Sequence, residues 1–349
     1  MSQKMTYAQS GVNLQVSDKA ARIASRIAQT TFTTRQKALI GRPVKLPNGF
    51  AGALDCGDFL LVNCTDGTGT KMAVAELTRN FATIGQDLLA MVVDDAVCLG
   101  AEGLALTNTL DAPKIQPVIV RRLLQSLARV CRKQRIVING GELAEVGATV
   151  NSLVWNATLV GVVSKTKLLT GAKIQPGDVI LALREKGLRS NGFTLARQIL
   201  ATKFGPKWFQ RKFRGQTWGK LLLTPSQIYS QGILALHGPY GEKAQVALHG
   251  IAHVTGGGII GNLPRIFPTK KLGAHFFDLW PSPDFVAELR RLGGLTLLEA
   301  RRAWNLGNGM LLVLNAAEAD KAIQILKTQK IAARVAGEIN TQGKITFSE

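Results

Sequence analysis

Acidic residues are scarce in this sequence. Its 349 residues include 23 Asp and Glu against 43 Lys and Arg, which gives a formal net charge of +20 at pH 7. A surplus of this size attracts phosphates, nucleotides, nucleic acids and anionic surfaces, but it does not select among them. A basic bias of the host's whole proteome would produce the same surplus, so the charge alone assigns no function.

Long hydrophobic runs are missing as well. No unbroken apolar stretch approaches the ~18 residues that a membrane-spanning helix needs. The N-terminal segment MSQKMTYAQSGVNLQ is polar and lacks the apolar core of a signal peptide. These absences predict a soluble, cytoplasmic protein with no membrane partner.

Cysteine and histidine are rare, with four of each. The cysteines form no CxxC pair, and three of them lie in apolar stretches, which predicts buried free thiols in a reducing compartment. His249 and His253 are four residues apart, but their Gly-rich segment lacks the glutamate of the zinc-protease motif. We therefore expect no zinc site.

What the sequence does contain is typical of an α/β protein with two domains. The composition is 46% hydrophobic and 19% charged with 36 glycines, an ordinary globular mixture. The length suits two domains of roughly 150 residues each. Segments with strand and helix periodicity alternate, and TGAKIQPGDVILAL at 170–183 combines a turn with a new strand. We expect domains at 1–168 and 169–349.

A strand predicted at 58–64 ends in the stretch TDGTGTK. This stretch includes Asp66, Gly67, Thr68, Gly69, Thr70 and Lys71. Its glycines free the backbone to turn N–H groups toward an anion, its threonines add hydroxyl donors, and its lysine adds a positive charge. Its acid would repel a phosphate unless a divalent cation lay between them. The stretch therefore predicts a metal-bridged phosphate site, although it lacks P-loop spacing and a plain strand-connecting turn is the alternative.

Two further acids occur in comparable settings. Asp95 lies beside Asp94 within an apolar helical segment, where an unpaired carboxylate is costly. Glu142 follows Gly140 and Gly141 directly after an apolar strand. With the acid of TDGTGTK, these residues form a candidate oxygen-ligand set for Mg²⁺ on a nucleotide phosphate, the alternative being that they simply face water.

A second glycine-rich loop, VTGGG, covers residues 254–258. It precedes NLPRIF, where Asn262 and Pro264 fit the start of a helix. Such a loop can hold an anion at a helix N-terminus. A plain turn is the alternative.

These motifs occur together in a known order. The segments are TDGTGTK, IGQDLLAM, GAE at 100–102, GGELAE, SNGFTLAR, LLTPSQIY, AHVTGGGIIGNLPRIFP and NLGNGM. With them the sequence resembles, over nearly its whole length, aminoimidazole ribonucleotide synthetase, also called phosphoribosylformylglycinamidine cyclo-ligase, of purine biosynthesis. The glycine-rich turns that contain acids, TDGTGTK and GGELAE, are called the acid turns below. They are shared with selenophosphate synthetase, thiamine monophosphate kinase and a hydrogenase maturation protein, whereas LLTPSQIY and HVTGGGIIGNLPR look specific to the cyclo-ligase.

The resemblance implies a fold and a reaction. The fold has an N-terminal α/β domain whose strands form a β-barrel across a homodimer, and a C-terminal α/β domain with a mixed sheet that closes a cleft. The reaction is the ATP-dependent ring closure of formylglycinamidine ribonucleotide to 5-aminoimidazole ribonucleotide, with release of ADP and phosphate and with Mg²⁺ as cofactor. ATP phosphorylates the formyl amide oxygen, and the amidine nitrogen then displaces phosphate.

The resemblance also implies roles for individual residues. The implied metal ligands are Asp66, Asp95 and Glu142. The implied nucleotide-binding residues are Asp66, Gly67, Thr68, Gly69, Thr70, Lys71, Gly140, Gly141, Thr255, Gly256, Gly257 and Gly258. The implied catalytic residues are Lys71, Asp95, Arg189 and Asn191, with Gly192 on the cleft side of the second domain.

Several positions depart from the family's pattern. Arg189 replaces a histidine before SNG, and an arginine that stays charged cannot act as a base. Asp94 replaces an asparagine, Leu143 replaces a threonine, and Asn108 stands where the family has Asp. The three implied metal ligands and Lys71 are retained. The alternatives are a related ATP-using enzyme with another acceptor, and a retired copy with a new role.

A basic aromatic tract at 203–220 supports a rival class of function. Its aromatic residues are Phe204, Trp208, Phe209, Phe213 and Trp218, and its basic residues are Lys203, Lys207, Arg211, Lys212, Arg214 and Lys220. Basic groups can follow a phosphate backbone while aromatic rings stack on bases. No recognised nucleic-acid-binding motif accompanies the tract, so we expect its aromatic side chains to pack into the second domain.

Overall fold

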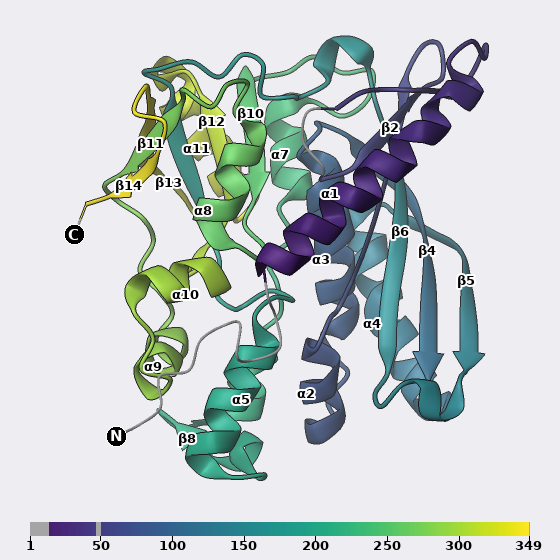
Figure 1. The fold of residues 1–349 in the computed structure, drawn as a ribbon, viewed down its shortest axis with the longest axis vertical. Coiled ribbons are helices and arrows are strands. Elements are labelled where there is room, and N and C mark those ends of the chain that lie inside the picture. Colours follow the sequence, from purple (N-terminus) through teal and green to yellow (C-terminus); the bar gives the residue numbers. More distant parts are fainter. Residues whose placement is uncertain (1–13, 47–49, 349) are drawn as a thin grey trace.

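The computed structural model describes residues 14–46 and 50–348, which form two α/β halves that lie side by side (Figure 1). Each half is built on a six-stranded sheet. Helices α3 and α7, one from each half, pack together between the two sheets. Both sheets mix parallel and antiparallel pairs, as expected for the predicted α/β class.

The first sheet has the strand order β1-β2-β3-β6-β4-β5, and only β4 and β5 run parallel. Its strands are β1 (Arg42–Pro43), β2 (Gly52–Asp55), β3 (Leu60–Gly67), β4 (Glu102–Ala112), β5 (Val137–Glu145) and β6 (Val154–Val163). Its helices are α2 (Lys71–Thr78), α3 (Ile84–Val97) and α4 (Pro117–Gln134), preceded in the chain by α1 (Leu14–Thr30). Helix α3 is apolar nearly all round and packs against β3 and β6, which explains why most of its side chains are buried.

The second sheet has the order β10-β12-β7-β13-β11-β14, with only β11 and β14 parallel. Its strands are β7 (Val179–Arg184), β10 (Leu248–His253), β11 (Gly273–Phe276), β12 (Asn308–Leu314), β13 (Ala333–Asn340) and β14 (Ile345–Phe347). A hairpin is formed by β8 (Lys212–Phe213) and β9 (Gln216–Thr217). The helices are α5 (Phe193–Phe204), α6 (Trp218–Leu222), α7 (Ser230–His237), α8 (Gly258–Asn262), α9 (Asp284–Leu292), α10 (Leu297–Ala303) and α11 (Ala319–Thr328).

Short 3₁₀ turns connect several of these elements. They are η1 (Thr31–Arg35), η2 (Gly147–Thr149), η3 (Lys165–Lys167), η4 (Trp208–Gln210), η5 (Leu263–Ile266) and η6 (Ala316–Glu318). The first sheet ends at Val163 and the second begins at Val179. We propose the boundary at 168/169 within this connection; the first 13 residues of the proposed 1–168 unit lie outside the described part of the chain.

The aromatic side chains of the 203–220 tract pack inward. Trp208 and Trp218 are buried in the core shared with the first sheet, and Phe213 stacks on Trp218 with ring centroids 5.3 Å apart. Rings held in this way are not available to stack on bases, so the packing interpretation is confirmed.

Two further predictions can be compared with the structure. All four cysteines are free thiols, three of them buried, as the sequence predicted. Within residues 14–46 and 50–348, no helix has both the length and the apolar character that crossing a membrane requires.

Candidate active site

The acid turn closes the end of strand β3 and leads into α2. The Asp66 carboxylate accepts a hydrogen bond from the Gly67 N–H at 2.6 Å. A Cβ on Gly67 would lie 2.1 Å from the Asn156 amide oxygen, so only glycine fits. Gly69 has φ +51° and lies against the Ser190 carbonyl oxygen of the second half. The backbone of the turn is therefore set by glycine, and the turn touches both halves.

Asp66 and Asp95 form a pair of half-buried carboxylates. Burial and the neighbouring charge of Asp95 raise the pKa of Asp66 to about 6. Burial raises the pKa of Asp95 to about 7, although Arg265 and Arg189 oppose that shift. Two poorly solvated carboxylates whose charges act on each other are unfavourable as a pair of anions. A cation between them would relieve both the burial cost and the mutual repulsion.

His253, at the end of β10, faces this pair. Its Nδ1 lies 2.7 Å from Asp95 Oδ1, and burial lowers its pKa well below the usual range. The ring is therefore neutral, and Nδ1–H donates to the carboxylate. Its Nε2 atom is buried without a hydrogen-bond partner among the described residues. Because the two histidines of HGIAH bond to different acids, with His249 on Asp178, they form no zinc pair.

The loop from Arg189 to Gly192 brings the second half onto the acid turn. The Ser190 carbonyl oxygen lies 3.2 Å from the position that a Cβ on Gly69 would take. The Asn191 amide nitrogen lies 3.7 Å from the corresponding position on Gly256. The Ser190 hydroxyl and the Asn191 amide oxygen are buried with no hydrogen-bond partner within the described chain. These unsatisfied polar atoms lie on a loop that approaches both the acid turn and the second glycine loop.

Arg189 itself is enclosed by protein groups. Its guanidinium bonds Asp94 at 2.6 Å and Glu185 at 3.0 Å, and all three side chains are fully buried. It also donates to the carbonyl oxygens of Gln227 and Ala90. Burial alone would lower the pKa of Arg189, but the two carboxylates raise it above its ordinary value. Arg189 therefore joins α3 of the first half to the 185–192 loop of the second, and none of its surface is open to a substrate.

Lys71 is also fully buried. Its ammonium donates to Asp87 Oδ1 and to the Thr224 carbonyl oxygen, each at 2.7 Å. The same carboxylate oxygen accepts from the N–H and the hydroxyl of Ser226. The lysine thus connects α2 to α3 and to the LLTPSQIY segment. Its ammonium group does not point outward to where a bound phosphate could reach it.

The glycine loop at 255–258 is held by Asn262. Its amide nitrogen donates to the carbonyl oxygens of Gly256 and Gly258, and the Thr255 hydroxyl donates to its amide oxygen. Gly257 and Gly258 have φ values of +92° and +61°. A Cβ on Gly258 would lie 1.7 Å from the Arg301 carbonyl oxygen. The loop is thus a rigid cradle. It leads directly into α8 at Gly258, and Asn262 and Pro264 lie at the start of the 3₁₀ turn η5 that follows, as the sequence predicted for a helix start.

Glu142 lies apart from the other two acids within one chain. Asp66 pairs with Ala157 of β6, and that residue pairs with Asn108 of β4. Asn108 pairs in turn with Gly141 of β5. Three strand spacings separate the two acid turns by about 14 Å. Within residues 14–46 and 50–348, no three His, Cys, Asp or Glu side chains are placed to hold one metal ion, so one chain brings together Asp66 and Asp95 but not Glu142.

The glycines before Glu142 line a separate shallow pocket. Its volume is about 340 Å³, and its other walls include Asn108, Val120 and Leu124. Gly140, Gly141 and Glu142 are exposed along the outer strand of the sheet. These predicted nucleotide-binding residues thus form a second surface, separate from the acid pair.

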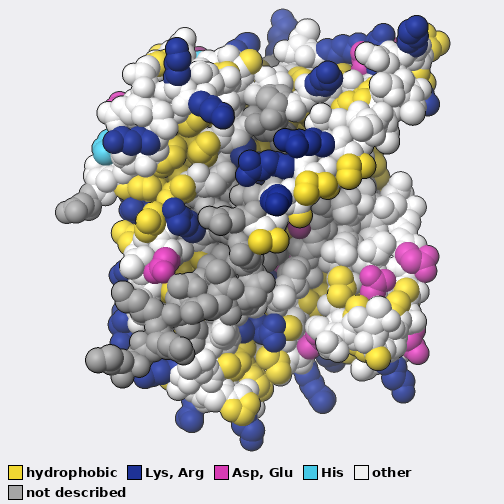
Figure 2. Space-filling model, in the orientation of Figure 1, with side chains coloured by type: hydrophobic (Ala, Val, Ile, Leu, Met, Phe, Trp, Pro, Cys, Tyr) yellow, Lys and Arg dark blue, Asp and Glu magenta, His cyan; other side chains and the backbone are white. Residues whose placement is uncertain are grey.

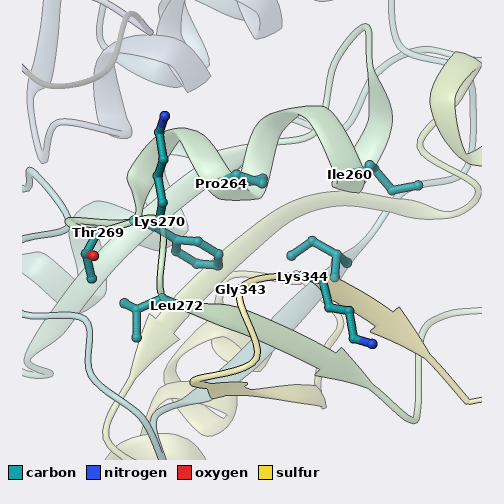
Figure 3. A pocket seen from close by; sticks show the side chains of 9 residues that line it. Ile260, Pro264, Thr269, Lys270, Leu272, Gly343 and Lys344 are labelled. Atoms are coloured by element: carbon teal, nitrogen blue, oxygen red, sulfur yellow. The ribbon is translucent and has the colours of Figure 1, made fainter.

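A further pocket of about 430 Å³ lies at the edge of the second sheet (Figure 3). Its walls are mainly apolar, from Ile260 and Pro264 to Leu272. The ammonium groups of Lys270 and Lys344 point in different directions and do not converge on a common point (Figure 3). Its lining residues include no Asp or Glu.

Sequence reasoning missed three parts of this site. His253 was considered only as a zinc ligand, and its contact with Asp95 joins residues 158 positions apart. Asp87 and Glu185 gave no signal, because a buried partner looks like any surface acid until the fold is known. One signal was available: Arg189 and Asp94 both depart from the family's pattern, and the structure shows that they contact each other.

Two family models cover most of the chain. The model described as AIR synthase related protein, N-terminal domain, matches residues 50–163. The model for the C-terminal domain of the same family matches residues 175–348. The first contains the acid turns, and the second contains the 189–192 loop and the glycine cradle.

Solved structures share the fold. The HypE–HypF complex aligns with a TM-score of 0.62 and 20% identity, covering 85% of this chain and 89% of the other. HypE in complex with ATP gives a TM-score of 0.60 at 18% identity, covering 82% and 81%. Thermotoga maritima PurL complexed with AMPPCP gives 0.55 at 16% identity, covering 86% of this chain and 44% of that one.

Curated relatives are similar along almost their full length. A phosphoribosylformylglycinamidine cyclo-ligase of Thermococcus kodakarensis is 36% identical over 323 residues, which is 92% of each chain. Relatives of the same name in Methanococcus vannielii and Sorangium cellulosum are 33% and 34% identical, covering 96% and 99% of this chain and 92% and 98% of theirs. Similarity of this extent, together with the two matching domain models, shows that the chain belongs to the phosphoribosylformylglycinamidine cyclo-ligase family.

Proposed function

We propose that the protein catalyses the ATP-dependent closure of formylglycinamidine ribonucleotide to 5-aminoimidazole ribonucleotide. The γ-phosphoryl group of ATP passes to the formyl amide oxygen and leaves ADP. The amidine nitrogen then attacks the formyl carbon that carries this oxygen, the ring closes, and phosphate departs. The observation that carries the proposal is the meeting of the Asp66–Asp95 pair with the 189–192 loop and the 255–258 cradle, in a chain whose curated relatives bear the cyclo-ligase name.

Mg²⁺ fits the acid pair. Mg²⁺ is usually held by one or two carboxylates, with the remaining ligands supplied by water and substrate phosphates. Asp66 and Asp95 provide two carboxylates whose pKa values are raised mainly by burial, so each would gain from a directly bound cation. When bound there, the ion would neutralise charge on the ATP phosphates. A magnesium site beside a glycine-rich turn also supports ATP as the nucleotide. HypE, which shares the fold, has been solved in complex with ATP.

The protein groups act by positioning. The turn offers the backbone N–H groups of Gly69 and Thr70 to the phosphates, because those of Gly67 and Thr68 are bonded to Asp66 and to the Trp155 carbonyl oxygen. The cradle at 255–258 closes the opposite side. His253 holds Asp95 through Nδ1, and its free Nε2 is directed into a buried setting. Asn191 contributes an amide whose oxygen lacks a protein partner in the described chain. The free Asn191 oxygen and His253 Nε2 are acceptors, suited to N–H or O–H groups of a ligand, whereas backbone N–H donors of the turn can stabilise negative charge that develops in phosphoryl transfer.

Arg189 and Lys71 support the site from behind it. Both are fully buried and bonded to carboxylates that belong to other elements. We propose that Arg189 sets the position of the 189–192 loop relative to α3, and that Lys71 sets α2 relative to α3. Neither side chain is assigned a contact with substrate.

We also propose a homodimer formed through the first sheet. Helices α3 and α4 pack on one face of that sheet, while the other face carries partly exposed residues such as Thr65, Thr158 and Leu104. A second copy covering this face would build the dimeric barrel that the resemblance implies. It would also give Glu142 of one copy a route to the acid pair of the other. Light scattering of the purified protein tests this: a monomer at micromolar concentration contradicts it.

The reaction is tested by substrate-dependent ADP release with Asp66→Asn as the variant. We expect this variant to fold with the wild-type melting temperature or a higher one, because it removes a poorly solvated carboxylate. We expect its Mg-ATP turnover to fall to background. Retained turnover would contradict the assignment of Asp66. ATP binding by the wild type without turnover of this substrate would indicate a different acceptor.

A further inference from the structure

A pocket of about 780 Å³ opens beside the acid turn and has no assigned role. Its walls include Gly69 and Thr70 of that turn, Glu76 of α2, Trp155 of β6 and Arg197 of α5. Pockets of about 300–1,000 Å³ are the usual size for small-molecule ligands. Because the pocket begins at the phosphate loop, a ligand within it would reach the proposed site of phosphoryl transfer.

Arg197 is the unusual group in this pocket. Its side chain is half-buried, and its Nε atom is buried with no hydrogen-bond partner within residues 14–46 and 50–348. Its guanidinium forms no ion pair with a described acid, and burial lowers its pKa. The charge of Glu76 opposes this shift but forms no ion pair, and a partly desolvated guanidinium with no ion-pair partner is costly in the folded protein. Such a group is suited to receive an anion from a ligand.

Glu76 does not supply that anion. It is the nearest source of negative charge, but one of its oxygens accepts from the Leu153 N–H at 3.2 Å and the other from the Ser152 hydroxyl. These bonds fix the carboxylate on the start of β6, and it forms no salt bridge with Arg197. The positive charge in the pocket is therefore only partly balanced.

Arg197 is also held at a fixed distance from the acid turn. Thr194, one turn earlier on α5, bonds through its hydroxyl to the Thr70 hydroxyl at 3.1 Å. Residues three apart lie on the same side of a helix, so Arg197 and Thr194 both face the pocket side. The net charge of +20 favours anions in general, and on the face shown in Figure 2 the Lys and Arg side chains are more numerous than Asp and Glu, which lie mainly at the lower right of the view.

We propose that this pocket binds the ribonucleotide substrate, with its 5′-phosphate on Arg197. The formyl end then lies at the Gly69–Thr70 turn, next to the γ-phosphate of ATP. A phosphate monoester suits a planar guanidinium without a metal. The triphosphate of ATP belongs on the other side of the turn, where the acid pair requires a cation. This inference rests on the proposed function and extends it to the substrate's location.

The test asks whether the effect of replacing Arg197 depends on the phosphate group of the substrate. Steady-state kinetics are measured for wild type and for Arg197→Gln, with the ribonucleotide and with its dephosphorylated riboside. An arginine–phosphate contact of this kind changes affinity by about 10- to 100-fold. We expect the KM for the ribonucleotide to rise by that factor in Arg197→Gln, while the KM for ATP and for the riboside stay within about twofold of wild type. Arg197→Lys should show a smaller rise, and Lys203→Gln, an exposed position on the same helix, should show none.

Each outcome decides the inference. An equal rise in KM for the ribonucleotide and the riboside would show a structural effect and overturn it. A rise in the KM for ATP alone would assign the pocket to ATP and also overturn it. If wild type releases no substrate-dependent ADP at all, the proposed function fails, and the inference fails with it. If Arg197→Gln does not fold, the same comparison is made with Arg197→Lys.

Discussion

Replacing Arg189 with alanine should destabilise the protein strongly. The substitution leaves the carboxylates of Asp94 and Glu185 buried and unpaired, and it removes donors from the carbonyl oxygens of Gln227 and Ala90. Breaking a buried ion pair by removing one partner costs about 3–5 kcal/mol. Because two acids lose their partner, we expect a cost at the upper end of that range.

A double-mutant cycle isolates the ion pair from other effects of the substitution. The cycle uses Arg189→Ala, Asp94→Asn and the double variant, each unfolded in urea. Residues in direct contact show coupling energies of about 0.5–3 kcal/mol. We expect a coupling energy near the top of that range, because Arg189→Ala should lower the free energy of unfolding less when Asp94 is already neutral.

Two further variants sharpen this test. Arg189 has φ +58°, a conformation that costs a non-glycine residue roughly 1–2 kcal/mol, so Arg189→Gly should be more stable than Arg189→Ala by about that amount. The double variant Asp94→Asn/Arg189→His restores the neutral residues that the family usually carries. It should recover more ADP release than either single substitution. Additive single effects, or a cost below about 1 kcal/mol for Arg189→Ala, would refute the positioning role.

Three other predictions follow from the site. Without divalent cations, the free energy of unfolding should fall as pH rises from about 4 to about 8. The reason is that the folded state holds protons on Asp66 and Asp95 with pKa values of about 6 and about 7, against 3.8 for an ordinary Asp. In a thermal-shift series the pH dependence of the melting temperature should be weaker in Asp95→Asn, and a wild-type melting temperature that does not change with pH would contradict this prediction. Gly258→Ala should lower the free energy of unfolding by at least about 2 kcal/mol, because of its positive φ and the contact of the new Cβ with the Arg301 carbonyl oxygen. The control Gly241→Ala, with open space around it, should lower it by only about 1 kcal/mol through backbone strain. Equal urea midpoints for the two variants would contradict the cradle's rigidity. Lys71→Met should destabilise the protein by about 3 kcal/mol or more because it leaves Asp87 unpaired, and a stable, inactive Lys71→Met would instead favour direct phosphate contact.

The fold class could be predicted because periodicity and glycine punctuation are local properties. The strand predicted at 58–64 corresponds to β3, which the structure places at Leu60–Gly67, and the basic aromatic tract packs as its apolar rings suggested. The acid turn could be recognised for the same reason, since Gly67 and Gly69 mark positions where a Cβ or an ordinary φ does not fit.

The long-range pairing could not be predicted from local patterns. The charge of Lys71 was assigned to phosphate because its partner, Asp87, is 16 residues away on another helix. Glu142 does not converge with the other acids within one chain for a different reason. Strand order decides which turns are neighbours, and the sheet places β6 and β4 between β3 and β5. Neither the order nor the buried partners are encoded in the spacing of any one motif.

The central claim is tested most directly by ADP release from the purified protein with Mg-ATP, with and without formylglycinamidine ribonucleotide. The account predicts ADP release that depends on the ribonucleotide, with aminoimidazole ribonucleotide formed in equal amount. ATP binding with no such dependence would contradict it.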